Sequence, residues 1–333
     1  MRRREVLTAM ASLALLRPAE ALPPSRRVIL NATKPSPPFY TGQVATRSIL
    51  PTGSFGVVET MCRSRHQAMA NLASLKCIWP NWYPATTTGV ETFAGGTVTI
   101  TASIEYPSNT FTQVQFSGAA SSVTSSIANI ISDAITVSIP KGAFFFVRTY
   151  FVGTSQSLLA SASVPVANLS VGEAATFGVS GVVDQTMGGT VVDTSGNGSY
   201  MYCPCAIIGQ INTPSVCIIG DSRALGLADS AAIGPYSYVG EEAKSIGVNF
   251  PFMTYANSGC TIQSWLTHNT QQKLLAAYVS HVFSNFGIND LQAGRTSAQV
   301  QADQASAAAL SPTVGSWRSL KEASSASVEG CAA

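Results

Sequence analysis

The sequence predicts an exported two-domain protein in which an all-β sandwich is followed by an α/β domain. Residues 26–205 form short alternating polar and apolar runs broken by Gly, Pro, Asn and Ser, a pattern typical of half-buried antiparallel strands. From residue 206 on, near-continuous apolar runs alternate with helical patterns, which indicates a parallel sheet with crossover helices. A short apolar stretch near the start of the chain predicts export.

The composition fits a folded exported protein and argues against several other classes. Of the 333 residues, 46% are hydrophobic and only 11% are charged, so an intrinsically disordered chain is excluded. The net charge is +2, from 19 Lys and Arg against 17 Asp and Glu. Because no basic run follows the first four residues, we expect no nucleic-acid partner.

The first 21 residues are expected to be an export signal that is cleaved after Ala21. Arg3 and Arg4 precede residues 6–16, an uncharged and mostly apolar stretch that is too short for a membrane span of about 20 residues. The segment resembles the twin-arginine signal of bacterial proteins that are exported folded. We therefore expect the twin-arginine export machinery as a partner, a periplasmic or secreted location, and no membrane span after cleavage. The alternative is a buried amphipathic N-terminal helix.

The cysteines and histidines do not have the spacing of a metal site. The chain has seven Cys and three His residues, with no C-x-x-C, H-E-x-x-H or H-x-x-x-H pattern, and Cys203 and Cys205 form C-P-C. We expect no metal and no cofactor. Cys62 and Cys77 are a possible disulfide pair if they face each other across two strands.

The β-rich part contains several runs with strand periodicity. Residues 97–104 and 134–139 alternate with period two, residues 111–116 do so more loosely, and residues 143–151 form an aromatic-rich run. Repeated short strands with turn signals between them predict a jelly-roll-like β-sandwich over residues 26–205. The aromatic cluster at residues 79–83 is interpreted as packing, and the alternative is a sugar-stacking platform.

The α/β part contains three readable strands, each followed by a polar cluster. The strands are expected at residues 215–219, 251–256 and 281–286, with helices ending near residue 246 and spanning residues 261–279 and 297–310. Open α/β sheets bind their ligands at the carboxyl ends of the strands. The three polar clusters are therefore the candidate site.

Three short motifs follow these strands in order: Gly220-Asp221-Ser222, then Gly259 within N-S-G, then Gly287-Ile288-Asn289-Asp290. Together they resemble the blocks of the SGNH (GDSL-type) hydrolases. The resemblance implies a flavodoxin-like α/β domain over residues 206–333. It also implies hydrolysis of a carboxylester or of an acetyl group on carbohydrate, so the expected partner is a small-molecule or carbohydrate ester.

The resemblance also implies roles for individual residues. Ser222 is the expected nucleophile, and its own amide, the amide of Gly259 and the side chain of Asn289 form the expected oxyanion hole. The alternative is structural, with Ser222 as a helix N-cap and the Asn289-Asp290 pair as a turn.

The late D-x-x-H block of the family is missing from this sequence. No histidine follows His281, and His268 is a remote candidate for the base. A flavodoxin-like sheet has five strands, but only three are readable, so we expect the domain to be truncated after its third strand and its activity to be impaired. The alternative is a non-catalytic exported protein that binds carbohydrate or another surface, with a decayed hydrolase domain.

Replacing Arg3 and Arg4 by Lys is expected to strand the precursor in the cytoplasm, because the twin-arginine pathway reads the arginine pair. Immunoblots of fractionated cells measure this, with the unchanged sequence as the control. Export at an unchanged rate in a strain that lacks the pathway would contradict the prediction.

Overall fold

The computed structural model describes residues 38–160, 167–194, 200–227, 229 and 238–309, together with the backbone of residues 318–319. The expected export signal, residues 1–21, lies outside the described residues. All described residues belong to one compact unit.

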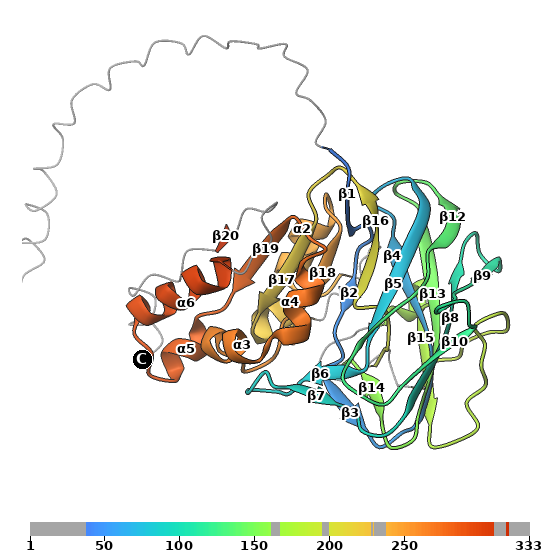
Figure 1. The fold of residues 1–333 in the computed structure, drawn as a ribbon, viewed down its shortest axis with the longest axis horizontal. Helices are drawn as coiled ribbons and strands as arrows, with labels where there is room; N and C mark the ends of the chain where they lie inside the picture. The colour runs from blue at the N-terminus through green and yellow to red at the C-terminus, as the bar shows by residue number, and fades with distance from the viewer. Residues whose placement is uncertain are drawn as a thin grey trace, which may run out of the picture. The chain divides into compact units, whose positions relative to one another are not determined.

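The β-rich part of the chain forms two antiparallel sheets (Figure 1). One has the order β1-β16-β5-β11, with β12 also on β5; its strands are β1 (Tyr40–Gln43), β5 (Leu72–Pro80), β11 (Asn129–Ile131), β12 (Ile135–Ile139) and β16 (Ala206–Ile211). The other has the order β10-β8-β13-β4-β15, with β9 on β8; its strands are β4 (Glu59–Gln67), β8 (Val98–Glu105), β9 (Phe111–Gln113), β10 (Ser121–Thr124), β13 (Phe144–Gly153) and β15 (Ala174–Gly178). Smaller elements are β3 (Gly53–Phe55) with β14 (Ser157–Leu159), the hairpin β6 (Trp82–Pro84) with β7 (Glu91–Phe93), and the 3-10 turn η1 (Leu169–Val171).

The inner faces of the two sheets share one hydrophobic core, so this part is a β-sandwich. Val98 and Ile100 of β8 are buried in that core with Trp79 of β5, as the period-two pattern predicts. Cys62 and Cys77 face the same core as free thiols, so they do not form the disulfide considered above. The four strands predicted in this part correspond to β8, β9, β12 and β13. The jelly-roll connectivity stays a prediction.

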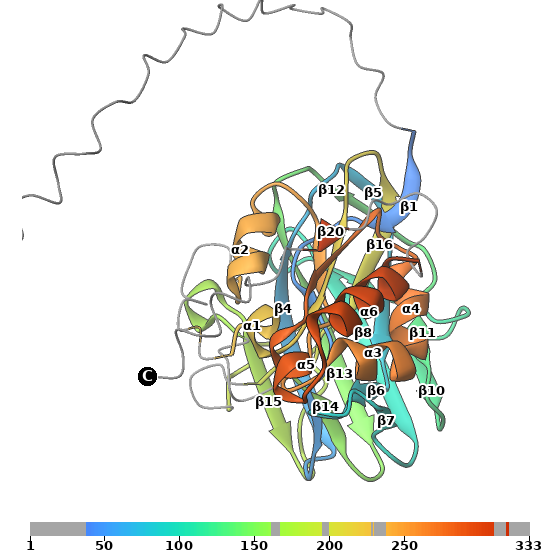
Figure 2. The same cartoon turned by 90° about the vertical axis from the view of Figure 1, so that its left-hand side faces the viewer.

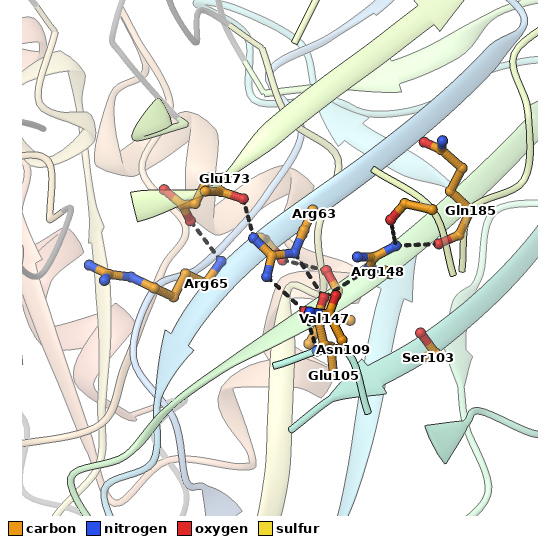
Figure 3. Close-up of polar contacts among 12 residues, drawn as sticks. Arg63, Arg65, Ser103, Glu105, Asn109, Val147, Arg148, Glu173 and Gln185 are labelled. Carbon is orange, nitrogen blue, oxygen red and sulfur yellow. Dashed lines mark hydrogen bonds and ion pairs between the residues drawn. The ribbon is translucent and has the colours of Figure 1, made fainter. Parts of the chain in front are cut away.

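The outer face of the six-stranded sheet carries an ion cluster centred on Glu105 (Figure 3). Arg63 donates from Nε and Nη2 to the two Glu105 carboxylate oxygens at 2.8 Å each, and Arg148 Nε donates to Oε2 at 2.8 Å. Arg148 Nη1 also donates to the main-chain oxygens of Gln185, Gly188 and Gly189. The cluster thus holds the irregular segment around residues 185–189 against the sheet. It also gives hydrogen-bond partners to polar groups that burial would otherwise leave unpaired.

The remaining sheet is parallel and has the order β2-β18-β17-β19-β20. Its strands are β2 (Ser48–Ile49), β17 (Val216–Gly220), β18 (Phe252–Thr254), β19 (His281–Asn285) and β20 (Arg318–Ser319). The helices are α1 (Ser222–Leu225), α2 (Glu241–Gly247), α3 (Ile262–His268), α4 (Thr270–Ala276), α5 (Ile288–Gln292) and α6 (Ser297–Ala309).

Helices cover both faces of the parallel sheet (Figure 2). On β17, Cys217 and Ile219 face a core that contains residues of α3, α4 and α6, whereas Val216 and Ile218 face one that contains residues of α1 and α2. Burial on both faces explains why this strand is an unbroken apolar run rather than an alternating one.

Two expectations for this part were wrong. The sheet does not stop after its third readable strand, because β20 pairs with β19; a two-residue strand has no periodicity to detect. The helix expected over residues 261–279 is divided at Asn269 into α3 and α4. The reason is long-range: the Glu91 carboxylate of β7 accepts from the Gln271 and Gln272 amides, at 2.8 and 2.9 Å, and so caps a new helix start.

The antiparallel and parallel parts share a core. Trp82 of the β6–β7 hairpin and Ile78 of β5 are fully buried in the same cluster as Ile219 and Met253 of the parallel sheet. Burial of Trp82, like that of Trp79, supports the packing interpretation of the aromatic cluster. The pairing changes from antiparallel to parallel between residues 211 and 216, and the domain boundary at residue 205 stays a prediction.

No helix in the described part of the chain is long and apolar enough to cross a membrane.

Glu105→Gln is expected to lower the free energy of unfolding at pH 7 by about 3 kcal/mol, because it leaves Arg63 and Arg148 without their buried counter-ion. Burial acts to raise the pKa of Glu105, but the hydrogen bonds from Arg63, the Asn109 amide and Arg148 outweigh it and lower the pKa to about 2. The unfolded carboxyl titrates near 4.3, so the unfolded state takes up the proton first as the pH falls. The contribution of Glu105 is therefore complete above about pH 5 and is lost towards pH 2.

Urea unfolding between pH 3 and pH 7 measures both effects. The difference between the native chain and Glu105→Gln is expected to narrow as the pH falls. The exposed Glu241→Gln is the control and is expected to change stability little at any pH. A constant difference across the pH range would contradict the assignment.

Candidate functional site

The candidate site lies at the carboxyl ends of β17, β18 and β19. Gly220, the last residue of β17, is in register with Asn285, the last residue of β19. The main-chain amide of Asn257, in the loop after β18, donates to the Gly220 carbonyl at 2.9 Å. The loops that carry the three sequence motifs are therefore brought to one edge of the parallel sheet, as expected for parallel strands.

Ser222 is the first residue of α1 and is half-buried. The N-cap of this helix is Asp221, whose carboxylate accepts from the Arg223 amide at 3.0 Å, so the alternative that Ser222 itself caps the helix is wrong. Arg223 also bonds the Asp221 carboxylate through its guanidinium and donates to the Asn285 carbonyl at 3.0 Å. Neither the hydroxyl nor the amide of Ser222 is hydrogen-bonded to another described residue.

Gly259 lies in the loop after β18 with a left-handed backbone, φ +73°. A Cβ at this position would lie 3.2 Å from Thr87 Oγ1, in the loop of the β6–β7 hairpin. Both the dihedral angle and the close approach favour glycine here. The Gly259 amide makes no hydrogen bond to the described residues, so it is available to a bound group.

Asn289 and Asp290 lie in the first turn of α5, and their side chains do different things. Asn289 Nδ2 donates to the Cys260 carbonyl at 3.2 Å, which holds the Asn289 amide against the loop that contains Gly259. Asp290 is fully buried and accepts from the Ile262 amide at the start of α3, at 3.0 and 3.1 Å. Burial raises the pKa of Asp290, and its role is to tie α5 to α3.

Cys260 and the three histidines of the chain are further candidates for a nucleophile or a base. Burial raises the pKa of the Cys260 thiol to about 12, so a thiolate nucleophile next to Gly259 is disfavoured. His66 is buried in the sandwich, where burial lowers its pKa to about 3. His281 begins β19, about 13 Å along the strand from Asn285. His268 ends α3, about 9 Å along the helix from Ile262. His281 thus lies at the opposite end of β19 from the motif loops, and His268 lies at the end of α3 that is farther from Asp290.

Sequence analysis did not select Glu242 and Thr87, which lie at or beside this edge of the sheet. Asn285 Nδ2 donates to Glu242 Oε1, and the other carboxylate oxygen, Oε2, is buried with no hydrogen-bond partner in the described part of the chain. Glu242 is one of two acidic residues in the first turn of α2, which is an ordinary position for a carboxylate near a helix N-terminus. Only the three-dimensional structure brings it to Asn285.

Among the described residues, no group of three His, Cys, Asp or Glu side chains is gathered as a metal site requires.

Comparisons with known proteins do not assign the chain to a family. No protein-family model matches the chain, and no curated protein matches it. Among solved structures, an acetyl xylan esterase from the rumen bacterium Butyrivibrio proteoclasticus aligns with 83% of this chain and 73% of its own length. The sequence identity is 11% and the TM-score is 0.19, and a score this low carries no argument about fold or function.

Gly259→Ala is expected to lower the free energy of unfolding by about 2 kcal/mol, through its left-handed dihedral and the contact with Thr87. Gly118→Ala is the matched control, because Gly118 has φ +80° but open space around a Cβ, and it is expected to cost about 1 kcal/mol. Urea unfolding of both variants measures the difference. Equal losses would show that Thr87 does not restrain Gly259.

Proposed function

We propose that the chain is an exported SGNH-type serine ester hydrolase whose site is formed by Ser222, Gly259 and Asn289. Its substrate is a carboxylester or an O-acetylated carbohydrate. The observation that carries the proposal is the meeting of the three ordered motifs at one sheet edge, joined by the Asn257–Gly220 and Asn289–Cys260 hydrogen bonds.

The strand order gives further support. If β17, β18, β19 and β20 are numbered in chain order, their order across the sheet is 2-1-3-4, which agrees with the first four positions of the flavodoxin-like order 2-1-3-4-5. In such a sheet the ligand lies at the carboxyl ends of the strands, where the three motifs are found.

The chemistry follows from hydrogen-bonding groups that can face a bound ester. Ser222 Oγ attacks the ester carbonyl carbon, and its proton goes to a base as the tetrahedral intermediate forms. The developing oxyanion accepts from the Ser222 amide, the Gly259 amide and the N–H of Asn289 Nδ2 that does not bond the Cys260 carbonyl. Collapse breaks the bond to the alkoxide, which takes the proton from the base and leaves as the alcohol; water then hydrolyses the acyl-serine and releases the acid. Each such donor typically contributes about 2.7–4 kcal/mol to the transition state.

The site lacks an identified general base for Ser222. A serine hydroxyl is a poor nucleophile until a base takes its proton, and among the described residues no histidine is hydrogen-bonded to Ser222. We therefore propose that turnover is impaired. The second candidate is a non-catalytic exported protein that binds carbohydrate or another surface through the same edge.

Ser222 is expected to react with a fluorophosphonate probe slowly, and faster when imidazole is added, because imidazole supplies the missing general base. Intact-mass spectrometry measures the labelling, with Ser222→Ala as the control. Without imidazole, a nitrophenyl ester is expected to be hydrolysed no faster than by Ser222→Ala. Asn289→Ala is expected to lower the imidazole-assisted rate about 100-fold.

Two outcomes would change these conclusions. If Ser222 is not labelled at any imidazole concentration, the proposed hydrolase function is wrong and the proposed binding function remains. A large Ser222-dependent rate without imidazole would show that another residue serves as the base.

A further inference from the structure

The β6–β7 hairpin comes from the β-rich part of the chain, but its loop contacts the loop after β18. The Thr87 amide donates to the Ser258 carbonyl at 3.0 Å, and Asn257 Nδ2 donates to the Ala85 carbonyl at 2.8 Å. Ser264 Oγ, in α3, donates to the Thr88 carbonyl. The hairpin loop is therefore held against Asn257 and Ser258, the two residues that precede Gly259 in the motif.

Thr87 has a strained backbone at this contact. Its φ is +70°, in the left-handed region that β-branched residues rarely adopt. Such strain persists only where the surroundings fix the conformation, and it is concentrated at functional sites. Here the turn hydrogen bonds of the hairpin, Gly89 N to Ala85 O and Ala85 N to Val90 O, both 2.8 Å, hold the loop from its own side.

The Thr87 hydroxyl is placed beside the proposed oxyanion hole. Of the atoms near Gly259, Thr87 Oγ1 is the nearest to the position that a Cβ would take, at 3.2 Å. The residue is exposed, and its hydroxyl makes no hydrogen bond to a described residue. Thr86 and Thr88 on either side are exposed as well. The hairpin loop thus presents the Thr87 hydroxyl next to Gly259.

We propose that Thr87 is a specificity-determining residue that hydrogen-bonds the sugar part of a carbohydrate ester bound at Ser222. This rests on the proposed function and narrows it, because a hydroxyl at this position favours a polyhydroxyl alcohol over an alkyl or aryl one. A bound sugar replaces the water at this exposed hydroxyl by a direct hydrogen bond, whereas an alkyl or aryl alcohol displaces the water without replacing its hydrogen bond. The Thr87 hydroxyl, which selects the substrate, lies in the loop of the β6–β7 hairpin, whereas the Ser222 hydroxyl, which attacks it, follows β17 of the parallel sheet.

Ligand-observed NMR titrations of the full chain test the proposal without requiring turnover. The probes are methyl 6-O-acetyl-glucoside, an ester whose sugar part keeps free hydroxyls, and phenyl acetate, whose alcohol part has none. Thr87→Val keeps the side-chain shape but removes the hydroxyl. It is expected to raise the Kd of the glucoside about fivefold and to leave that of phenyl acetate within about twofold. Thr136→Val, at an exposed threonine of β12, is the matched control and is expected to change neither.

Thr87→Gly is a second variant that relieves the left-handed strain, so it keeps the test valid if Thr87→Val fails to fold. It is expected to weaken glucoside binding as well. Equal Kd values for the glucoside in the native chain and both variants, or no binding of it at all, would overturn the role of Thr87. Imidazole-assisted labelling of Ser222 in that case would leave the proposed function standing. If glucoside binding depends on Thr87 but Ser222 is never labelled, both the proposed hydrolase function and the proposed role of Thr87 in ester specificity are wrong.

Discussion

The arrangement of the candidate site depends on the contact between the β6–β7 hairpin and the loop after β18. That loop, residues 257–259, is bound on one side by the Gly220 carbonyl of its own sheet and on the other by Ala85 and Thr87 of the hairpin. The hairpin is in turn anchored by Trp82, which is fully buried in the core beneath the parallel sheet, and by Glu91, which caps α4. A glycine amide that is to bind an oxyanion must be held in place before the reaction, because reorganisation would cost catalytic free energy. Here the rigidity comes from a segment more than a hundred residues earlier in the chain.

Local periodicity predicted the secondary structure well where strands are long or buried. β8, β13, β17 and β19 begin within one residue of the expected positions, because side-chain alternation or an unbroken apolar run is visible in the sequence itself. The division of the helix at Asn269 was missed because the cap that causes it, Glu91, comes from a distant strand. β2 and β20 have two residues each, too few for any pattern.

The candidate site shows the same difference between features that follow from local sequence and features that depend on distant segments. The order of the three motifs selected Ser222, Gly259 and Asn289 as candidates, and parallel pairing is sufficient to explain why their loops meet at one edge. Asp221, rather than Ser222, is the helix cap, which no spacing argument distinguished. Thr87 and Glu242 have no sequence signal, since a threonine in a turn and a glutamate in the first turn of a helix are ordinary residues. Their interest comes only from what tertiary structure places beside them, namely Gly259 and Asn285.

β2 lies at the edge of the parallel sheet, where Ser48 and Ile49 pair with Met253 and Thr254 of β18. The strand is made early in synthesis, whereas its partner emerges only after the whole sandwich. The covering of this sheet edge therefore has a high contact order and must wait for most of the chain, which predicts slow final assembly. Until then β18 presents unpaired main-chain groups, the feature that makes sheet edges prone to intermolecular pairing. This edge of the sheet therefore stays open to pairing with other chains until β2 covers it.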